Sequence, residues 1–200
     1  MTRIEYFFPQ SVYVTENVCT DILPELEDAC KKAQIEYGTS RNGCLYVDSC
    51  HKTASMILKH QYPFTIVAEN IKTHVANYAK SLGYDVTTDD IHIDNMWFNI
   101  SNQGDFNFPH AHGDCHFSGA FYIKTTEENE IVFVHPNYHN GQIPNPDNSN
   151  ELSYETMSFK CEVGNMMVWR NYLIHYTQRQ RYEGEKIVIS FNTRIKTEYN

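Results

Sequence analysis

Six stretches decide the fold: IHIDNMWFNIS (residues 91–101), HFSGAFYIK (116–124), EIVFVHP (130–136), LSYETMSFKCE (152–162), NMMVWRNYLIHY (165–176) and EKIVISFNTRIK (185–196). These stretches are rich in β-branched and aromatic residues, and clusters of Gly, Asn, Pro and Asp separate them. Strands at this spacing, without an internal repeat, are typical of a β-sandwich or barrel.

The N-terminal half carries a helical signal. Apolar residues recur at helical spacing over residues 21–37, which Gly38 follows, and again over residues 65–82, which Gly83 follows. We therefore expect two helices with these bounds, each ended by a glycine.

The other N-terminal segments are less regular. Residues 4–14 alternate loosely and contain Pro9, which predicts an edge strand or an extended arm. Residues 41–63 are ambiguous, with a short strand pattern at 44–47 and one or two helical turns at 53–60.

Helices that precede a run of strands predict an α+β, mainly β fold. We expect a double-stranded β-helix, or jelly roll, braced by the N-terminal helices. The length of 200 residues suits one buried core, so we expect a single domain over residues 1–200. Residues 1–90 would supply a strand and helical support, and residues 91–200 the jelly-roll core. The polar loop 137–150 has the length of functional or mobile loops.

Composition and charge exclude several classes of protein. Lys and Arg number 16 against 25 Asp and Glu, which gives a net charge of -9 without a basic cluster, so direct nucleic-acid binding is not expected. No apolar run approaches the roughly 18 residues of a membrane span, and the first residues lack the apolar core of a signal peptide. Six scattered Cys without a CxxC pair indicate reduced thiols. We expect a cytoplasmic protein, without a membrane partner.

Histidines supply the candidate metal ligands. In His110-Ala111-His112, a strand would point both imidazoles to one face, with α-carbons about 6.6 Å apart. His175, after the apolar run at 166–169, can supply a third ligand from a strand end. An open iron(II) site uses three protein ligands, whereas a structural zinc site wants four, usually with thiolates. Asp114 offers an alternative set of His112, Asp114 and His175.

Each of these features also has a structural explanation. The histidine pair could be two loop histidines beside Pro109, and an HxH motif alone is a weak signal. Trp97 and Asn99 share a strand face and suit core packing as well as a substrate pocket. Cys115 and His116, as neighbours on a strand, would point apart, which argues against a thiol enzyme. Surface roles are expected for three further residues: His135, His139 and Arg170.

The motifs occur in a recognisable order within residues 97–124, 164–176 and 186–192. They are a W-x-N strand, a G-D-[YF]-N turn, a P-H-x-H segment, S-G-x-[FY]-Y, a strand leading to a distal His, and a last strand ending in F-N. This series resembles a phage- and bacteria-borne branch of the 2-oxoglutarate- and iron(II)-dependent oxygenases, which are similar to prolyl hydroxylases. The resemblance covers about half the chain densely and reaches the N-terminus through the Phe-Pro at residues 8 and 9.

The resemblance implies a role for each motif residue. His110 and His112 would be the proximal iron ligands, His175 the distal ligand, and Tyr122 a hydrogen-bond donor to a carboxylate of 2-oxoglutarate. Lys186 stands where the family has an arginine that pairs with the far carboxylate.

The sequence departs from the family at that anchor. A lysine supplies a point charge without the bidentate fork of arginine. Val188 stands where the family has a serine, and strand periodicity puts Ser190 and Arg194 on the same face as Lys186, where either could assist.

The resemblance implies an iron(II)- and 2-oxoglutarate-dependent oxygenase, a hydroxylase of a protein side chain, a nucleobase or a small metabolite, with ascorbate as an accompanying reductant. A non-catalytic jelly-roll module that keeps a metal site is the alternative, favoured by the changes at Lys186 and Val188. A phage structural or adhesion protein would make the motif order a coincidence. If phage-encoded, the protein would act in the host cytoplasm, and it could form a homodimer.

Overall fold

The computed structural model describes residues 3, 9–37, 40–41, 51–52, 58–127, 130–136, 147, 150 and 153–196. In chain order the elements are β1 (Val12–Thr15), η1 (Thr20–Ile22), α1 (Leu23–Tyr37), β2 (Ser40–Arg41), β3 (His51–Lys52), η2 (Leu58–His60), α2 (Phe64–Ser81), η3 (Thr88–Asp90), β4 (Ile91–Ser101), β5 (Asn107–His110), β6 (Phe117–Lys124), β7 (Glu130–Val134), β8 (Thr156–Lys160), β9 (Met166–Arg170), β10 (His175–Thr177) and β11 (Lys186–Ile195).

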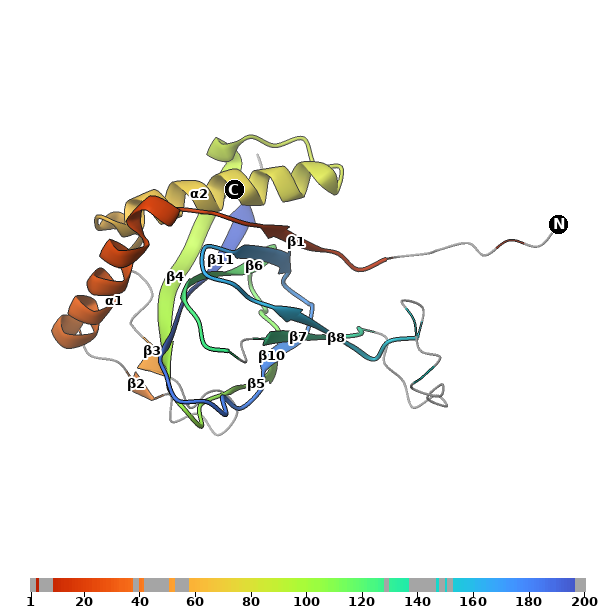
Figure 1. The fold of residues 1–200 in the computed structure, drawn as a ribbon. Helices are drawn as coiled ribbons and strands as arrows, with labels where there is room; N and C mark the ends of the chain where they lie inside the picture. The colour runs from red at the N-terminus through yellow and green to blue at the C-terminus, as the bar shows by residue number, and fades with distance from the viewer. Residues whose placement is uncertain are drawn as a thin grey trace.

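Two antiparallel sheets form the body of the molecule (Figure 1). Among the described strands, the larger sheet has the order β1-β9-β6-β11-β4-β3-β2 and the smaller one β5-β10-β7-β8. This is the expected mainly β jelly roll. Of the edge strand or arm predicted over residues 4–14, only the end coincides with a strand, since β1 begins at Val12 at an edge of the larger sheet, and residues 4–8 lie outside the described part of the chain.

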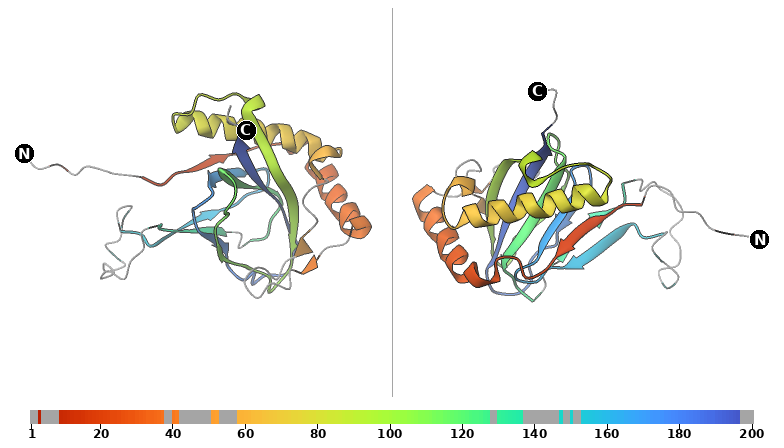
Figure 2. Two further views of the ribbon diagram at one scale, coloured as in Figure 1. Left: turned by 180° about the vertical axis from the view of Figure 1, so that it is seen from behind. Right: turned by 90° about the horizontal axis from the view of Figure 1, so that it is seen from above.

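The two predicted helices are confirmed within two residues at each end. Their apolar stripes are buried because α1 and α2 lie against one face of the larger sheet, which α2 crosses in the view from above (Figure 2). Lys124 of β6 donates to Glu27 of α1 over 2.7 Å and ties that helix to the sheet. The helix α2 ends where Gly83 adopts a φ of 91°, a conformation that side-chain-bearing residues avoid.

Strand alternation gives the larger sheet two different faces. In β6 the odd-numbered residues join the core under the helices, whereas Ala120 and Tyr122 face the smaller sheet. In β11 the same rule sends Ile187, Ile189 and Phe191 to the helices. Lys186 and Val188 therefore face the space between the sheets, where they line a cavity.

A β-bulge changes the face that β4 presents. Asn192 pairs with Asn95 and Thr193 pairs with Ile93, so Asp94 is the extra residue in β4. Before the bulge the odd-numbered residues of β4 face the helices, and after it the even-numbered ones do. The bulge thereby directs Trp97, Asn99 and Ser101 toward the cavity.

One sequence expectation differs from the structure, and others fall partly or wholly outside the described residues. The stretch 165–176 is two strands, because a turn in which Leu173 donates to the Arg170 carbonyl moves the chain from one sheet to the other. A helical turn is present at the end of residues 53–60, as η2. Outside the described residues are the pattern at 44–47 and, apart from Asp147 and Asn150, the loop 137–150.

None of the helices in the described part of the chain has the length and apolar character needed to cross a membrane.

Candidate functional site

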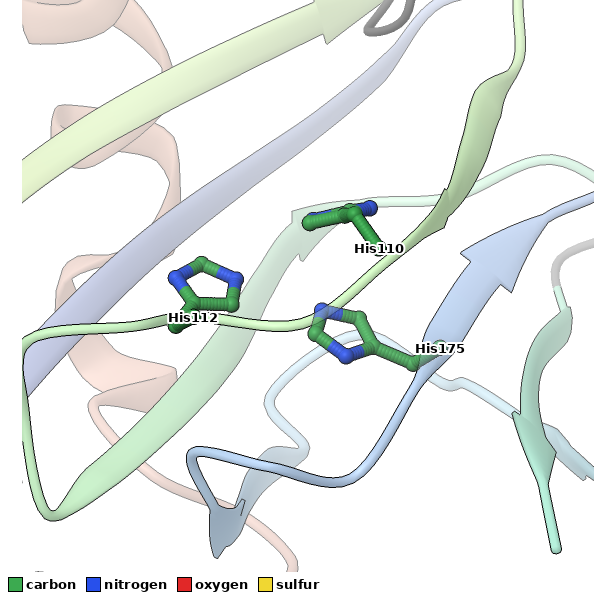
Figure 3. A group of neighbouring side chains, drawn as sticks. All are labelled: His110, His112 and His175. Atoms are coloured by element: carbon green, nitrogen blue, oxygen red, sulfur yellow. The ribbon is translucent and has the colours of Figure 1, made fainter. Parts of the chain in front are cut away.

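The side chains of three histidines lie close together, His110, His112 and His175 (Figure 3). His110 is the last residue of β5, His112 follows in the next loop, and His175 begins β10. His175 and His110 face each other directly in the pairing of β10 with β5. One candidate ligand atom from each residue lies within 4.8 Å of the other two, and only His175 of the three is buried.

The sequence suggested that alternation along one strand brings the imidazoles of His110 and His112 together. The structure brings them together in another way. The strand β5 ends at His110, and His112 lies beyond it in a loop, where its backbone N–H donates to the Asn171 carbonyl over 2.9 Å. The prediction that both histidines share one strand face is therefore wrong, although the two imidazoles still converge. A backbone hydrogen bond to the turn that precedes His175 holds the loop in place.

A bulge in β5 directs its ends toward the cavity. His175 pairs with His110, and two residues later Thr177 pairs with Asn107, so β5 contains one residue more than its partner. Pro109 lies in this bulge and has no N–H to leave unpaired. As a result, Asn107 and His110 both line the cavity, while Phe108 and Pro109 are exposed.

Backbone carbonyls fix the tautomers of two of the histidines. The Nδ1 atom of His110 lies 2.7 Å from the Phe108 carbonyl, and that of His175 lies 2.9 Å from the Leu173 carbonyl. Because a carbonyl oxygen only accepts, Nδ1 carries the proton in both rings, and the Nε2 lone pair is available to a metal. Burial lowers the pKa of His175 to about 3, with a further lowering by the nearby His110, so this ring stays neutral.

Aromatic rings enclose the histidines. Trp169, from the larger sheet, makes an edge contact with His175 at 4.7 Å between ring centroids. Trp97 stacks on His112 at 6.2 Å, and the His112 and His175 rings are nearly parallel at 5.2 Å. These rings limit the access of water to one side of the cluster.

The cavity runs from the histidines toward Lys186, which is buried at the start of β11. The cavity has a volume of about 60 Å³. Among the described residues that line it, Lys186 is the only one with a permanent charge, and none is a carboxylate. Other polar side chains line the walls: Asn99, Ser101, Asn107, Tyr122, Thr177 and Ser190.

The residues predicted to assist Lys186 have different positions. Ser190 lines the cavity and accepts a hydrogen bond from Asn99 Nδ2 at 2.8 Å. Arg194 does not line the cavity, since it donates to the Asp94 carboxylate at 2.8 Å and also contacts Asp114. The structure therefore gives no support to Arg194 as an anchor within the cavity.

Asp114 lies apart from the histidine cluster. Its side chain is 97% exposed, and one of its oxygens is 3.0 Å from an Arg194 nitrogen. Cys115 and His116 form no catalytic pair, because the thiol contacts Ser118 while His116 Nδ1 accepts the Ile195 N–H.

An Asp114→Asn variant tests the alternative ligand set. We expect metal affinity to stay within about twofold of the wild type, and stability to change by less than about 1 kcal/mol, because an exposed ion pair contributes little. A His110→Asn variant, in contrast, should lose metal affinity. Metal titration of both variants makes the comparison. A tenfold or greater loss in Asp114→Asn, with His110→Asn unaffected, would instead support ligation by His112, Asp114 and His175.

The sequence did not single out several cavity residues. Trp169 lies in a stretch whose pattern predicts only an apolar strand, Asn107 is expected only as the last residue of the G-D-[YF]-N turn, and no pattern indicates Thr177. Asn107 donates its N–H to the Thr177 hydroxyl at 3.0 Å across two strands that are far apart in the chain. Only the register of β5 against β10 brings them together, and no local pattern reports that register.

The comparison with protein families is decisive. Residues 95–192 match the family described as "Putative 2OG-Fe(II) oxygenase", a span that includes all three histidines, Tyr122 and Lys186. The chain belongs to the 2OG-Fe(II) oxygenase family. It is therefore an oxygenase that depends on iron(II) and 2-oxoglutarate. No curated protein matches this oxygenase in sequence.

Solved structures share the fold of this oxygenase. A prolyl-4-hydroxylase from Pseudomonas putida is 10% identical, with a TM-score of 0.67 over 94% of each chain. The viral collagen prolyl hydroxylase from Paramecium Bursaria Chlorella virus-1, in complex with 2-oxoglutarate, is 11% identical, with a TM-score of 0.60 over 92% of this chain and 96% of that one. HygX from Streptomyces hygroscopicus, with nickel and 2-oxoglutarate bound, is 10% identical, with a TM-score of 0.61 over 96% of this chain and 86% of that one.

Proposed function

We propose that His110, His112 and His175 hold the iron(II), that Lys186 and Tyr122 bind the far carboxylate of 2-oxoglutarate, and that the enzyme hydroxylates a carbon–hydrogen bond presented at the cavity mouth. One observation carries this proposal: three imidazoles converge at one end of a cavity that has a buried lysine in its wall.

The donor set fits the metal. Imidazole nitrogen suits iron(II), and carbonyl-bound Nδ1 protons leave Nε2 as the ligand atom of His110 and His175. One candidate ligand atom of each histidine lies within 4.8 Å of the other two, so all three rings could hold one ion after adjustment of their side chains.

The protein's own residues position the co-substrate. Iron(II), when bound, would supply the activation of dioxygen, which is the oxidant, and 2-oxoglutarate would supply two of the electrons that dioxygen takes up as it is oxidised to succinate and carbon dioxide. Among the described residues of the cavity wall, Lys186 brings a positive charge and none is a carboxylate, which favours a keto acid with a second carboxylate over one without it. Val188 and Ile131 line the same cavity with apolar surface and exclude water from it.

The size of the cavity limits what else can enter. A cavity of about 60 Å³ leaves little room beside a bound small organic acid. We therefore place the substrate at the mouth, near Trp97 and His112, where it would extend only its reacting group toward the metal.

Replacing Lys186 by methionine tests the anchor. We expect the KM for 2-oxoglutarate to rise about thirtyfold to a hundredfold, because losing one partner of a buried charge pair costs about 2–3 kcal/mol. Metal affinity should not change. Lys160→Met, at an exposed lysine of β8, is the matched control. An unchanged KM in Lys186→Met would remove Lys186 from the proposed binding site.

Co-substrate turnover tests the function itself. The purified protein, given iron(II), ascorbate, dioxygen and 2-oxoglutarate, should release succinate and carbon dioxide in equal amounts. Tight metal binding without any release would contradict the proposal and favour a non-catalytic binding module.

We further propose that this enzyme works in the cytoplasm, of a host cell if it is encoded by a phage. Four cysteines among the described residues are free thiols, which supports a reducing compartment: Cys19, Cys30, Cys115 and Cys161.

A further inference from the structure

The hydroxyl of Tyr122 has an unusual resting partner. Tyr122 is 2% exposed, and its hydroxyl contacts the thiol of Cys161, which is equally buried. The Cys161 thiol can donate to the Phe159 carbonyl at 3.4 Å or to the Met167 sulfur at 3.9 Å, and its own sulfur accepts from the Tyr122 hydroxyl and from the Ile131 backbone. Burial raises the pKa of Tyr122 well above its usual range, which keeps the hydroxyl protonated as a donor.

The turn that begins at Cys161 also holds the backbone of Tyr122. The Tyr122 N–H donates to the Asn165 carbonyl at 3.0 Å, and the Gly164 N–H donates to the Tyr122 carbonyl at 2.8 Å. Gly164 adopts a φ of 84° in this turn, which favours glycine. One short segment therefore contacts both the main chain and the side chain of Tyr122.

The chemistry of sulfur makes this contact easy to exchange. A buried tyrosine hydroxyl needs a partner, but a thiol sulfur is a weak acceptor compared with a hydroxyl or carbonyl oxygen. An incoming carboxylate is a much stronger acceptor. The Tyr122 hydroxyl can thus exchange its hydrogen bond to Cys161 for one to the carboxylate at a small cost in free energy. An oxygen acceptor at residue 161 would instead compete with the carboxylate for this hydroxyl.

Cys161 also does not compete with the co-substrate for the charge of Lys186. The charge of Lys186 acts on the thiol, which places the two groups near each other. Burial nevertheless raises the pKa of Cys161, so the group is a neutral thiol rather than a thiolate that would pair with the lysine.

We propose that Cys161 is a positioning residue that keeps the Tyr122 hydroxyl on a weak sulfur acceptor until the far carboxylate of an acidic co-substrate takes its place. This inference rests on the proposed role of Tyr122 and Lys186 in binding 2-oxoglutarate. The residue at position 161 would then change the affinity for the co-substrate by acting through the Tyr122 hydroxyl.

Two substitutions at one position separate this role from simple packing. Cys161→Ser replaces the sulfur beside Tyr122 by a hydroxyl oxygen, which is a stronger acceptor. We expect its Kd for 2-oxoglutarate to rise about threefold to tenfold, the range of one ordinary hydrogen bond. Cys161→Ala removes the competing acceptor, and its Kd should equal the wild-type value or fall below it.

The measurement is a titration of 2-oxoglutarate into protein loaded with manganese(II) in place of iron(II). Manganese affinity and thermal unfolding report whether each variant is folded. Cys115→Ser, at a buried cysteine that contacts Ser118 outside the cavity, is the matched control and should bind 2-oxoglutarate as the wild type does. In a Tyr122→Phe background, the further change Cys161→Ser should leave the Kd for 2-oxoglutarate unaltered.

The outcomes distinguish the two proposals. The positioning role is supported if the Kd for 2-oxoglutarate rises in Cys161→Ser, does not rise in Cys161→Ala or Cys115→Ser, and does not change with Cys161→Ser in the Tyr122→Phe background. Equal affinities in the wild type and Cys161→Ser would overturn it, as would a loss that persists without the Tyr122 hydroxyl. If the wild type itself binds no 2-oxoglutarate, the proposed function fails, and this inference fails with it.

Discussion

A His175→Ala variant is expected to lose its metal and at least about a thousandfold in kcat/KM, the largest effect on activity that the structure predicts. His175 is the one buried member of the cluster, and its Nδ1 is held by the Leu173 carbonyl. The two remaining imidazoles are partly exposed, and two ligands bind an ion more weakly than three. Metal content after dialysis and succinate release measure the two losses.

Two further variants make this test specific. His175→Gln keeps most of the side-chain volume beside Trp169 and should show the same loss of metal with less effect on stability. His92→Ala, at a histidine whose side chain is 56% exposed and lies outside the cluster, should leave both measurements unchanged. Retention of metal and turnover by both His175 variants would exclude His175 as a ligand.

The largest effect on stability is expected for Gly119→Ala. A Cβ at this residue would lie 2.1 Å from Cζ of Phe191 and 2.5 Å from the Met167 carbonyl oxygen. The carbonyl belongs to the neighbouring strand β9, so the ring cannot resolve the clash by moving alone. We expect the free energy of unfolding to fall by about 3 kcal/mol or more, at the upper end of overpacking effects.

The measurement is the midpoint of denaturant unfolding of Gly119→Ala, compared with that of a control variant, Gly113→Ala. A Cβ at Gly113 would meet nothing within 4 Å, and its φ is not in the positive range, so this control should unfold as the wild type does. Equal midpoints for the two variants would mean that β6 and β9 are not packed as the structure has them.

Much of the fold could be predicted because alternation and helical spacing are local signals. The helix α2 follows from its apolar stripe and Gly83, and β11 follows from the alternation that separates Lys186 and Val188 from Ile187 and Ile189. The bounds of these elements agree closely with the sequence pattern.

The irregularities of the strands could not be predicted. The bulge at Asp94 changes which side of β4 faces the cavity, and the bulge at Pro109 aligns Asn107 with His110. Each bulge depends on pairing with a strand more than sixty residues away, so the local sequence only weakly indicates where the bulge lies. The loop position of His112 was missed for the same reason, since its anchor is the Asn171 carbonyl.

The convergence of three histidines could be predicted from the sequence. The spacing of His110 and His112 and the resemblance that adds His175 indicate it. Trp169 and Cys161 could not be predicted, because an indole and a thiol in an apolar strand or turn look like ordinary core residues until the facing sheet is placed.

Addition of 2-oxoglutarate to the iron(II)-loaded protein without oxygen tests the central claim most directly. We predict a visible charge-transfer absorption that saturates at one 2-oxoglutarate per iron, is absent in His175→Gln, and needs about thirtyfold or more co-substrate in Lys186→Met. Iron that binds without this absorption, or an absorption that persists in His175→Gln, would contradict a three-histidine centre that holds 2-oxoglutarate.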